Sequence, residues 1–507
     1  MTNVEKKKKI SFPTAFTVLF IVLFLAAVLT YVVPAGSYDK LAYNTTSKNF
    51  TVTHPNGKVE TLPGKQETLD KLGIVSPLEK FEDGSLYKPI GIPGTYQKVK
   101  QNPQGIAAFI KAPIDGVYNA IDIILFIFII GGLMGILDYS GAFNSGIAAL
   151  SRVTKGHEYV LIIFMTFLIA LGGTTFGMCE ETIALYPILV PVFLAAKYDA
   201  MVCIAAIYMG SCVGTMMSTV NPFSAVIASN AAGINFTDGM YFRLFGLIVG
   251  TIITAVYIMR YASKVRKDPT ASIIYEDREK IAAKFSRDTT NAEPLKPSFA
   301  IALILFLATF VVMVYGVKEL EWWFGEMTTL FLVSSVIIGI ILRLPEKIFV
   351  TKFIEGAGQL IGVALICGVA RSVNMILDAG MVSDSILNSL SGMVEGMNQY
   401  AFIIVIMIIY FILGFFINSS SGLAVLSIPI IAPLADAVGL PRDVIITAYL
   451  FGLGMISFIT PTGLVLATLD LVDVTYDKWL KFAVPLMAIL TVFCIILLLV
   501  QTGMSSI

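Results

Sequence analysis

The chain has 507 residues, of which 56% are hydrophobic and only 14% are charged, and its mean hydropathy is +0.82. A soluble protein carries about a quarter charged residues, so this composition excludes an ordinary soluble domain and predicts a polytopic α-helical membrane protein. Basic and acidic residues number 35 each, so the net charge gives no indication of a nucleic-acid partner. With two histidines and no CxxC pair, we expect no metal held by His or Cys and no resident cofactor.

Apolar segments follow one another from residue 12 to the end of the chain. The first covers about residues 12–33, directly after four lysines at 6–9, and is too long for the core of a signal peptide. Residues 36–104 are polar and mixed in charge, and their proline and glycine content argues against a long helix. Further apolar segments begin near Gly116, Tyr159, Ala200, Met240, Pro297, Thr328, Gly356, Ala401, Val444 and Trp479.

Basic residues gather at segment ends that the positive-inside rule assigns to the cytoplasm. These clusters lie at residues 6–9, 152–155, 260–267 and 343–352. We therefore expect the N-terminus, Lys155, Lys197 and Lys264 inside, and Lys65 and Asp384 outside. The same count places the C-terminus on the extracellular or periplasmic side.

The two halves of the chain share an interrupted apolar pattern. Residues 171–181 read Leu-Gly-Gly-Thr-Thr-Phe-Gly-Met-Cys-Glu-Glu, residues 413–422 read Leu-Gly-Phe-Phe-Ile-Asn-Ser-Ser-Ser-Gly, and two prolines follow each stretch. The surrounding apolar segments, 159–196 and 401–437, are too long for one membrane span. Each therefore predicts a re-entrant hairpin with its polar tip at membrane depth, where irregular backbone must be buried in protein or line a cavity.

Further matches extend the similarity between the halves. Ile114-Asp115-Gly116 matches Ile354-Glu355-Gly356, and these two segments enter the membrane from opposite sides in our count of crossings. The predicted fold is therefore all-α and polytopic, with two inverted-topology repeats that each contain a re-entrant hairpin and a broken transmembrane helix. The predicted boundaries are a first repeat over 1–260 with an extracellular loop at about 36–104, a cytoplasmic linker over 261–296, and a second, inverted repeat over 297–507.

Two further breaks occur at Asn221-Pro222 and at Thr460-Pro461-Thr462. Proline removes a helix hydrogen bond and frees a carbonyl, so each break offers oxygen ligands near the midplane. Small residues that simply let helices pack are the structural alternative. The predicted substrate-binding residues are Thr174, Thr175, Gly177, Glu180, Glu181, Thr182, Thr219, Asn221, Asn418, Ser419, Ser420, Ser421, Thr460, Thr462 and Arg371. Oxygen atoms near Ser218, Asn221, Ser420 and Thr460 are the candidate ligands for a coupling Na⁺.

The pair Glu180-Glu181 carries the strongest chemical signal, because a carboxylate at membrane depth costs at least about 2.5–3.5 kcal/mol on insertion scales. The pair could bind a cationic substrate, carry a coupling H⁺, help to hold Na⁺, or form a structural ion pair. Arg371 interrupts another apolar run. It could bind a substrate carboxylate through its planar fork, or act as a structural counter-ion to Glu180, Glu181 or Asp378.

The segments at 173–182, 221–222 and 418–422 together resemble the YfcC-like branch of the C4-dicarboxylate anaerobic carrier family (DcuC-type), over nearly the whole chain. The resemblance implies the ion-transporter superfamily fold, elevator-like motion, a bacterial inner membrane and an option to form a homodimer. It also implies basic amino acid antiport of the arginine/ornithine type, while the wider family carries dicarboxylates.

Two adjacent carboxylates repel a dianion, so Glu180 and Glu181 favour a basic amino acid substrate over a dicarboxylate. The alternative is a C4-dicarboxylate carrier in which a glutamate serves H⁺ or Na⁺ coupling. An ion channel needs a continuous polar pore, and an enzyme needs a nucleophile–base pair or a metal set. The sequence favours neither, so we expect a carrier that is not an enzyme.

Overall fold

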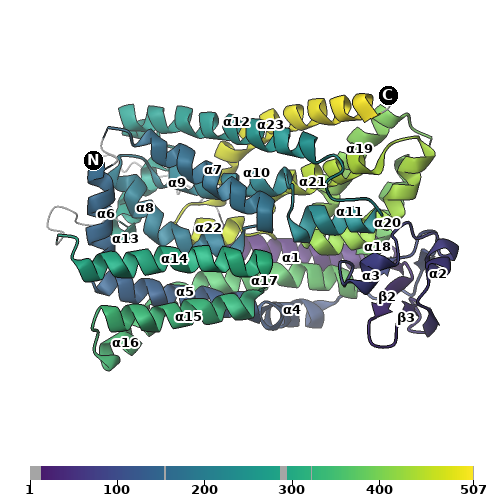
Figure 1. The fold of residues 1–507 in the computed structure, drawn as a ribbon, viewed down its shortest axis with the longest axis horizontal. Coiled ribbons are helices and arrows are strands. Elements are labelled where there is room, and N and C mark those ends of the chain that lie inside the picture. Colours follow the sequence, from purple (N-terminus) through teal and green to yellow (C-terminus); the bar gives the residue numbers. More distant parts are fainter. Residues whose placement is uncertain (1–12, 154–155, 286–293, 321, 395, 506–507) are drawn as a thin grey trace, which may run out of the picture.

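The computed structural model describes residues 13–153, 156–285, 294–320, 322–394 and 396–505, so Lys155 and the lysines at 6–9 lie outside the described residues. Within those ranges, ten helices are long and apolar enough to cross a membrane, which confirms the polytopic helical class. Most of them lie along the long axis of the molecule (Figure 1). They are α1 (Ala15–Val32), α5 (Ile121–Tyr139), α7 (Tyr159–Phe176), α12 (Met240–Lys267), α14 (Pro297–Glu319), α15 (Phe324–Ile341), α17 (Ile361–Ala379), α19 (Gln399–Phe416), α20 (Ser420–Ala437) and α23 (Tyr476–Ser505).

The outside of the helical bundle is apolar. On α14, for example, Ile304, Leu307 and Val311 are each 63–70% exposed. A continuous apolar surface of this kind would aggregate in water, so these faces are suited to lipid.

The segments predicted to begin near Gly116 and Gly356 each form two helices. The first is α4 (Ile106–Asn119) followed by α5, with Ala120 between them. The second is α16 (Glu346–Gln359) followed by α17, with Leu360 between them. The spans begin at Ile121 and Ile361, near the predicted starts, but the sequence missed the preceding helices because α4 and α16 are amphipathic and their charged residues lower the local hydropathy.

Glycines allow the two halves to interlock. Helix α4 packs on α17, and α16 packs on α5. A Cβ atom on Gly116 would lie 2.2 Å from the Gly368 carbonyl oxygen, and one on Gly356 would lie 2.3 Å from that of Gly131. Only glycine fits at such close approaches between helix backbones, so each half supplies the short helix that crosses the long helix of the other.

Each half contains a long helix that ends at a polar tip and is followed by helices, although the first half is divided into more pieces. Helices α7 and α19 have 18 residues each. After α7 come η1 (Glu180–Leu185), α8 (Tyr186–Ala195), α9 (Ala200–Ile204), η2 (Ala205–Met209), α10 (Gly210–Met216), η3 (Pro222–Val226) and α11 (Ile227–Ala231). After α19 come α20, α21 (Arg442–Ser457) and α22 (Val465–Leu471). This order fits two repeats, while their opposite membrane orientation and the re-entrant course of the hairpins stay predictions.

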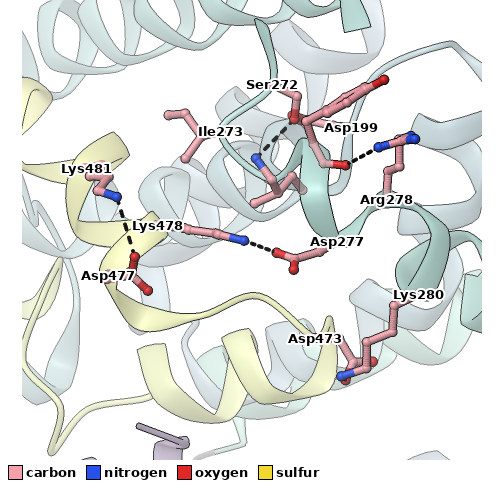
Figure 2. A network of polar contacts seen from close by, with 12 residues as sticks. Asp199, Ser272, Ile273, Asp277, Arg278, Lys280, Asp473, Asp477, Lys478 and Lys481 are labelled. Atoms are coloured by element: carbon pink, nitrogen blue, oxygen red, sulfur yellow. Dashed lines mark hydrogen bonds and ion pairs between the residues drawn. The ribbon is translucent and has the colours of Figure 1, made fainter. Parts of the chain in front are cut away.

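The linker between the halves is folded and binds both of them (Figure 2). It contains η4 (Pro269–Ala271), η5 (Tyr275–Asp277) and α13 (Arg278–Phe285). Ser272 donates a 2.6 Å hydrogen bond to Asp199, at the start of α9. Lys280 and Lys478 form 2.6 Å ion pairs with Asp473 and Asp277, which join the linker to α22 and α23. The linker therefore fixes the first half to the second at the end of the molecule that carries α6 (Ala142–Val153), α8 and α13 (Figure 1).

Residues 36–104, which we call the outer segment, form a small β-rich unit at the opposite end of the molecule (Figure 1). Its four-stranded antiparallel sheet has the order β4-β3-β2-β5, and β1 pairs with β6. Phe50, Phe81 and Ile90 are at most 2% exposed and form part of its core. The elements are β1 (Gly36–Ser37), β2 (Lys40–Asn44), β3 (Asn49–Thr53), β4 (Val59–Pro63), α2 (Gln66–Lys71), α3 (Glu79–Glu82), β5 (Ile90–Gly91) and β6 (Gln97–Lys98). The prediction of an all-α protein is therefore wrong for residues 36–104, which contain β-strands.

The two ends of the molecule can be assigned to membrane sides by labelling. In a variant without Cys179 and Cys367, the two partly exposed native thiols, we expect Lys264→Cys to react only from the cytoplasmic side. Lys65→Cys, on the outer segment, should react only from outside. Impermeant maleimide applied to intact cells and to inverted vesicles measures both. Labelling of the two positions from the same side would contradict the predicted orientation.

Candidate functional site

The first hairpin tip is hydrogen-bonded to the first broken helix. Helix α7 ends at Phe176, the Gly177 that follows has a positive φ of 76° that suits glycine, and the chain then turns into η1. The Thr174 hydroxyl donates to the Met217 carbonyl at 3.1 Å and accepts from the Thr219 backbone N–H at 3.0 Å. Asn221 donates to the Gly173 carbonyl at 3.4 Å. The tip and the break therefore satisfy each other's backbone groups.

The Asn221-Pro222 break has a local cause. The Asn221 side chain accepts a 2.9 Å hydrogen bond from the Phe223 N–H and caps the short helix that follows. Pro222 occupies the first position of that helix, where no N–H is needed. The cap and the proline together end one helix after Met216 and begin the next, as the sequence predicts.

The second tip repeats this arrangement with different residues. Ser419 caps α20 by accepting a 3.1 Å hydrogen bond from the Gly422 N–H. Asn418 donates to the Thr462 carbonyl at 2.8 Å, which joins the tip to the second broken helix. The Thr460 and Thr462 hydroxyls are 2.8 Å apart and bond to each other.

One contact joins the first tip and broken helix to the second tip and broken helix. The Ser420 hydroxyl donates to the Phe223 carbonyl at 3.0 Å, so the second tip touches the first broken helix. Tyr449 on α21 in turn donates to the Ser420 carbonyl at 2.7 Å. All four predicted breaks thus belong to one hydrogen-bonded cluster, which we call the central site.

Not every predicted residue joins the tips to the breaks. Thr175 donates back to the Leu171 carbonyl at 2.7 Å, as the structural alternative expects, and Thr182 donates to Cys179 within its own tip. Ser218 is 3.2 Å from Ser224. Ser218 and Asn221 belong to the first break, and Thr460 belongs to the second, so these contacts do not collect the candidate sodium ligands into one shell. The Na⁺ site stays a prediction.

Charge is concentrated beside the first tip. Glu181 is 8% exposed and accepts a 3.1 Å hydrogen bond from the Cys179 N–H. Glu180 is half-buried and lies in electrostatic range of Arg371. Within the described part of the chain, neither glutamate forms an ion pair with Arg371 or with any other base. Asp378 instead accepts from Ser383 at 3.1 Å, so Arg371 is not fixed by a direct carboxylate contact.

Two residues of this region were missed by the sequence reasoning. Asp122 stands in the first turn of α5 and acts electrostatically on Glu180. The sequence could have indicated Asp122, because it is a carboxylate at the edge of an apolar run. Lys88 of the outer segment donates a 2.6 Å hydrogen bond to Ser421, and no local pattern points to that contact across 333 residues of sequence.

A helical membrane bundle in which interrupted helices gather polar and charged groups inside the protein has the architecture of a transporter. The model of the C4-dicarboxylate anaerobic carrier family, DcuC, matches residues 12–503, and the chain belongs to this membrane transporter family.

Two relatives cover nearly the whole chain. An uncharacterized protein of Haemophilus influenzae is 45% identical over 505 residues, which is 99% of each chain. A protein of Escherichia coli K12, described as "Putative basic amino acid antiporter YfcC", is 29% identical over 522 aligned positions, or 97% of this chain and 96% of that protein. Among solved structures, the YdaH transporter of Alcanivorax borkumensis aligns over 97% of this chain and 99% of its own with a TM-score of 0.40 and 12% identity.

Removing the polar contacts of the second tip should weaken binding at the central site. In Asn418→Ala and Ser420→Ala we expect the affinity for substrate or coupling ion to fall about tenfold, because each loses one partly buried hydrogen bond of about 1 kcal/mol and a positioned ligand. Binding to the purified protein measures the change, and size-exclusion chromatography checks folding. Thr351→Ala is the matched control, because it removes an exposed threonine hydroxyl on α16, away from the central site. Wild-type affinity and coupling in both tip variants would show that Asn418 and Ser420 contribute only to helix packing.

Proposed function

We propose that the protein is a secondary active carrier or antiporter of small amino or carboxylic acids, and that its substrates are basic amino acids such as arginine and ornithine. The observation that carries this proposal is the pair Glu180 and Glu181 beside the broken helices, free of internal ion pairs among the described residues. Asp122 adds a third carboxylate in electrostatic range. A guanidinium or ammonium group would neutralise this charge, whereas a dianion would add to the repulsion.

The two relatives and the family support the coarser part of this proposal. Family membership supports a membrane carrier rather than an enzyme. The printed name of the E. coli relative supports a basic amino acid as substrate and exchange as the mode of transport. We further propose elevator-type alternating access, residence in the bacterial inner membrane, H⁺ or Na⁺ as the coupling ion, and a homodimer as the assembly.

A C4-dicarboxylate carrier is the second candidate function. The family description names such substrates. A specific observation also favours it, since Lys88 places a positive charge at the second tip and Arg371 lies in electrostatic range of that lysine. In this alternative Glu180 or Glu181 carries the coupling H⁺ or helps to hold Na⁺.

A glutamine scan separates the two candidates. If Glu180 or Glu181 binds the cationic end of an amino acid, Glu→Gln leaves that charge buried without a counter-ion, at a cost on the order of 3–5 kcal/mol. Arginine binding should then fall by at least about a hundredfold at every pH, while neutral analogues lose less. If the glutamate carries the coupling proton, glutamine imitates the protonated state, so binding survives and pH-driven uptake is lost.

Binding measured by titration calorimetry and uptake measured in liposomes, both from pH 5 to 8, decide between these outcomes. Glu346→Gln, an exposed glutamate at the start of α16, is the matched control. Undiminished arginine binding in both Glu180→Gln and Glu181→Gln would overturn the cationic substrate. Counterflow in the same liposomes tests the carrier itself, because a carrier shows trans-stimulation and a channel does not.

A further inference from the structure

The outer segment packs on two helices that carry parts of the central site. Strand β5 lies against α20, close enough that a Cβ atom on Gly91 would be 3.2 Å from the Leu426 carbonyl. Ser76 donates hydrogen bonds of 2.9 and 3.0 Å to the Asn230 and Ala231 carbonyls at the end of α11. The segment is therefore attached both to the helix of the second hairpin and to the helix that follows the first break.

The side chain of Lys88 reaches from this segment to the second tip. Its ammonium donates a 2.6 Å hydrogen bond to the hydroxyl of Ser421, in the first turn of α20. Leu86 and Ile90 on either side are at most 3% exposed in the core of the outer segment. Because both neighbours are fixed, the backbone at Lys88 is held in place, and the lysine is directed to the tip rather than free in solvent.

Among the residues that the structure describes, the Lys88 ammonium has a basic neighbour in electrostatic range and no acidic ion-pair partner. Burial lowers the pKa of Lys88 below its ordinary value, and the positive charge of Arg371 lowers it further. Arg371 lies on α17 and also acts on Glu180. Among the described residues, neither Lys88 nor Arg371 forms an ion pair. Two like charges brought together in this way repel each other, and an anion between them would remove that repulsion.

We propose that Lys88 and Arg371 bind the carboxylate of the substrate, so that the outer segment contributes a residue to the central site. The proposal rests on the proposed function only in that the substrate is an amino or carboxylic acid. A basic amino acid would place its carboxylate at this pair and its cationic end at Glu180. Because the carboxylate then bridges α17 and the outer segment, bound substrate holds the segment against the tip.

Removal of the lysine charge should abolish the preference for a carboxylate. The probes are arginine, agmatine, which is arginine without its carboxylate, and succinate. In full-length purified Lys88→Met, we expect arginine affinity to fall about ten- to a hundredfold while agmatine affinity is unchanged, because only arginine loses a charge-assisted hydrogen bond. Lys88→Arg should restore most of the arginine affinity. Lys58→Met, an exposed lysine in the β3–β4 turn of the same segment, is the matched control.

The outcomes separate this proposal from the proposed function. Equal losses for arginine and agmatine, or no loss for either, would overturn the proposal that Lys88 and Arg371 bind the substrate carboxylate. A gain in arginine affinity would also overturn it, since Lys88 would then be an internal competitor of the cationic substrate. If the wild type binds succinate and not arginine, the proposal of a basic substrate is wrong. Lower succinate affinity in Lys88→Met would then still support carboxylate binding by Lys88 and Arg371, and unchanged succinate affinity would overturn it. Failure of the folded wild type to bind any carboxylate probe would overturn both proposals.

Discussion

Inside a bilayer every backbone N–H and C=O group must find its partner within the protein, and the central site follows from that constraint. Helix ends at membrane depth would leave such groups unpaired. Here Thr174 and Asn221 bind backbone groups across the first tip and break, and Asn418 does the same across the second. The polar side chains that accompany the interruptions therefore also stabilise them. A substrate that binds at the tips competes with, or adds to, these internal contacts.

The frame around the site is held by a different kind of contact. Backbones meet directly at Gly116 and Gly356, and the linker binds both halves through ion pairs such as that of Lys478 with Asp277. The second tip, by contrast, meets the first broken helix through the packing of α20 on η3 and α11 and a hydrogen bond from Ser420, worth about 1 kcal/mol net. The interlocked crossings would lose many close contacts if they separated. We therefore expect the contacts that change during transport to be those of the tips.

The two halves are alike in backbone and unlike in charge. Helices α5 and α17 have equal length, yet α5 carries Asp122 in its first turn and Gly131 at the position where α17 has Arg371. The first tip is acidic and the second is neutral, and Lys88 adds a positive charge to the second. If the two halves carried the same charges, a site between them would bind its substrate equally well in two opposite orientations. The unequal charges distinguish the first tip from the second, and our proposal of a substrate with both a cationic and a carboxylate end depends on that difference.

Much of this protein is determined by short-range sequence patterns. Long apolar runs require helices in lipid, and the capping residues Asn221, followed by Pro222, and Ser419 interrupt them locally, so the helical class and the positions of the breaks could be predicted. The start of α4 could not, because an amphipathic helix lacks the hydropathy of a span. Only the tertiary structure decided that Ser420 meets Phe223, that Arg371 has no direct ion pair among the described residues, and that Lys88 reaches Ser421. The Ser420 and Lys88 contacts join residues 197 and 333 positions apart, and they depend on how the helices and the outer segment pack, which no local pattern in the chain records.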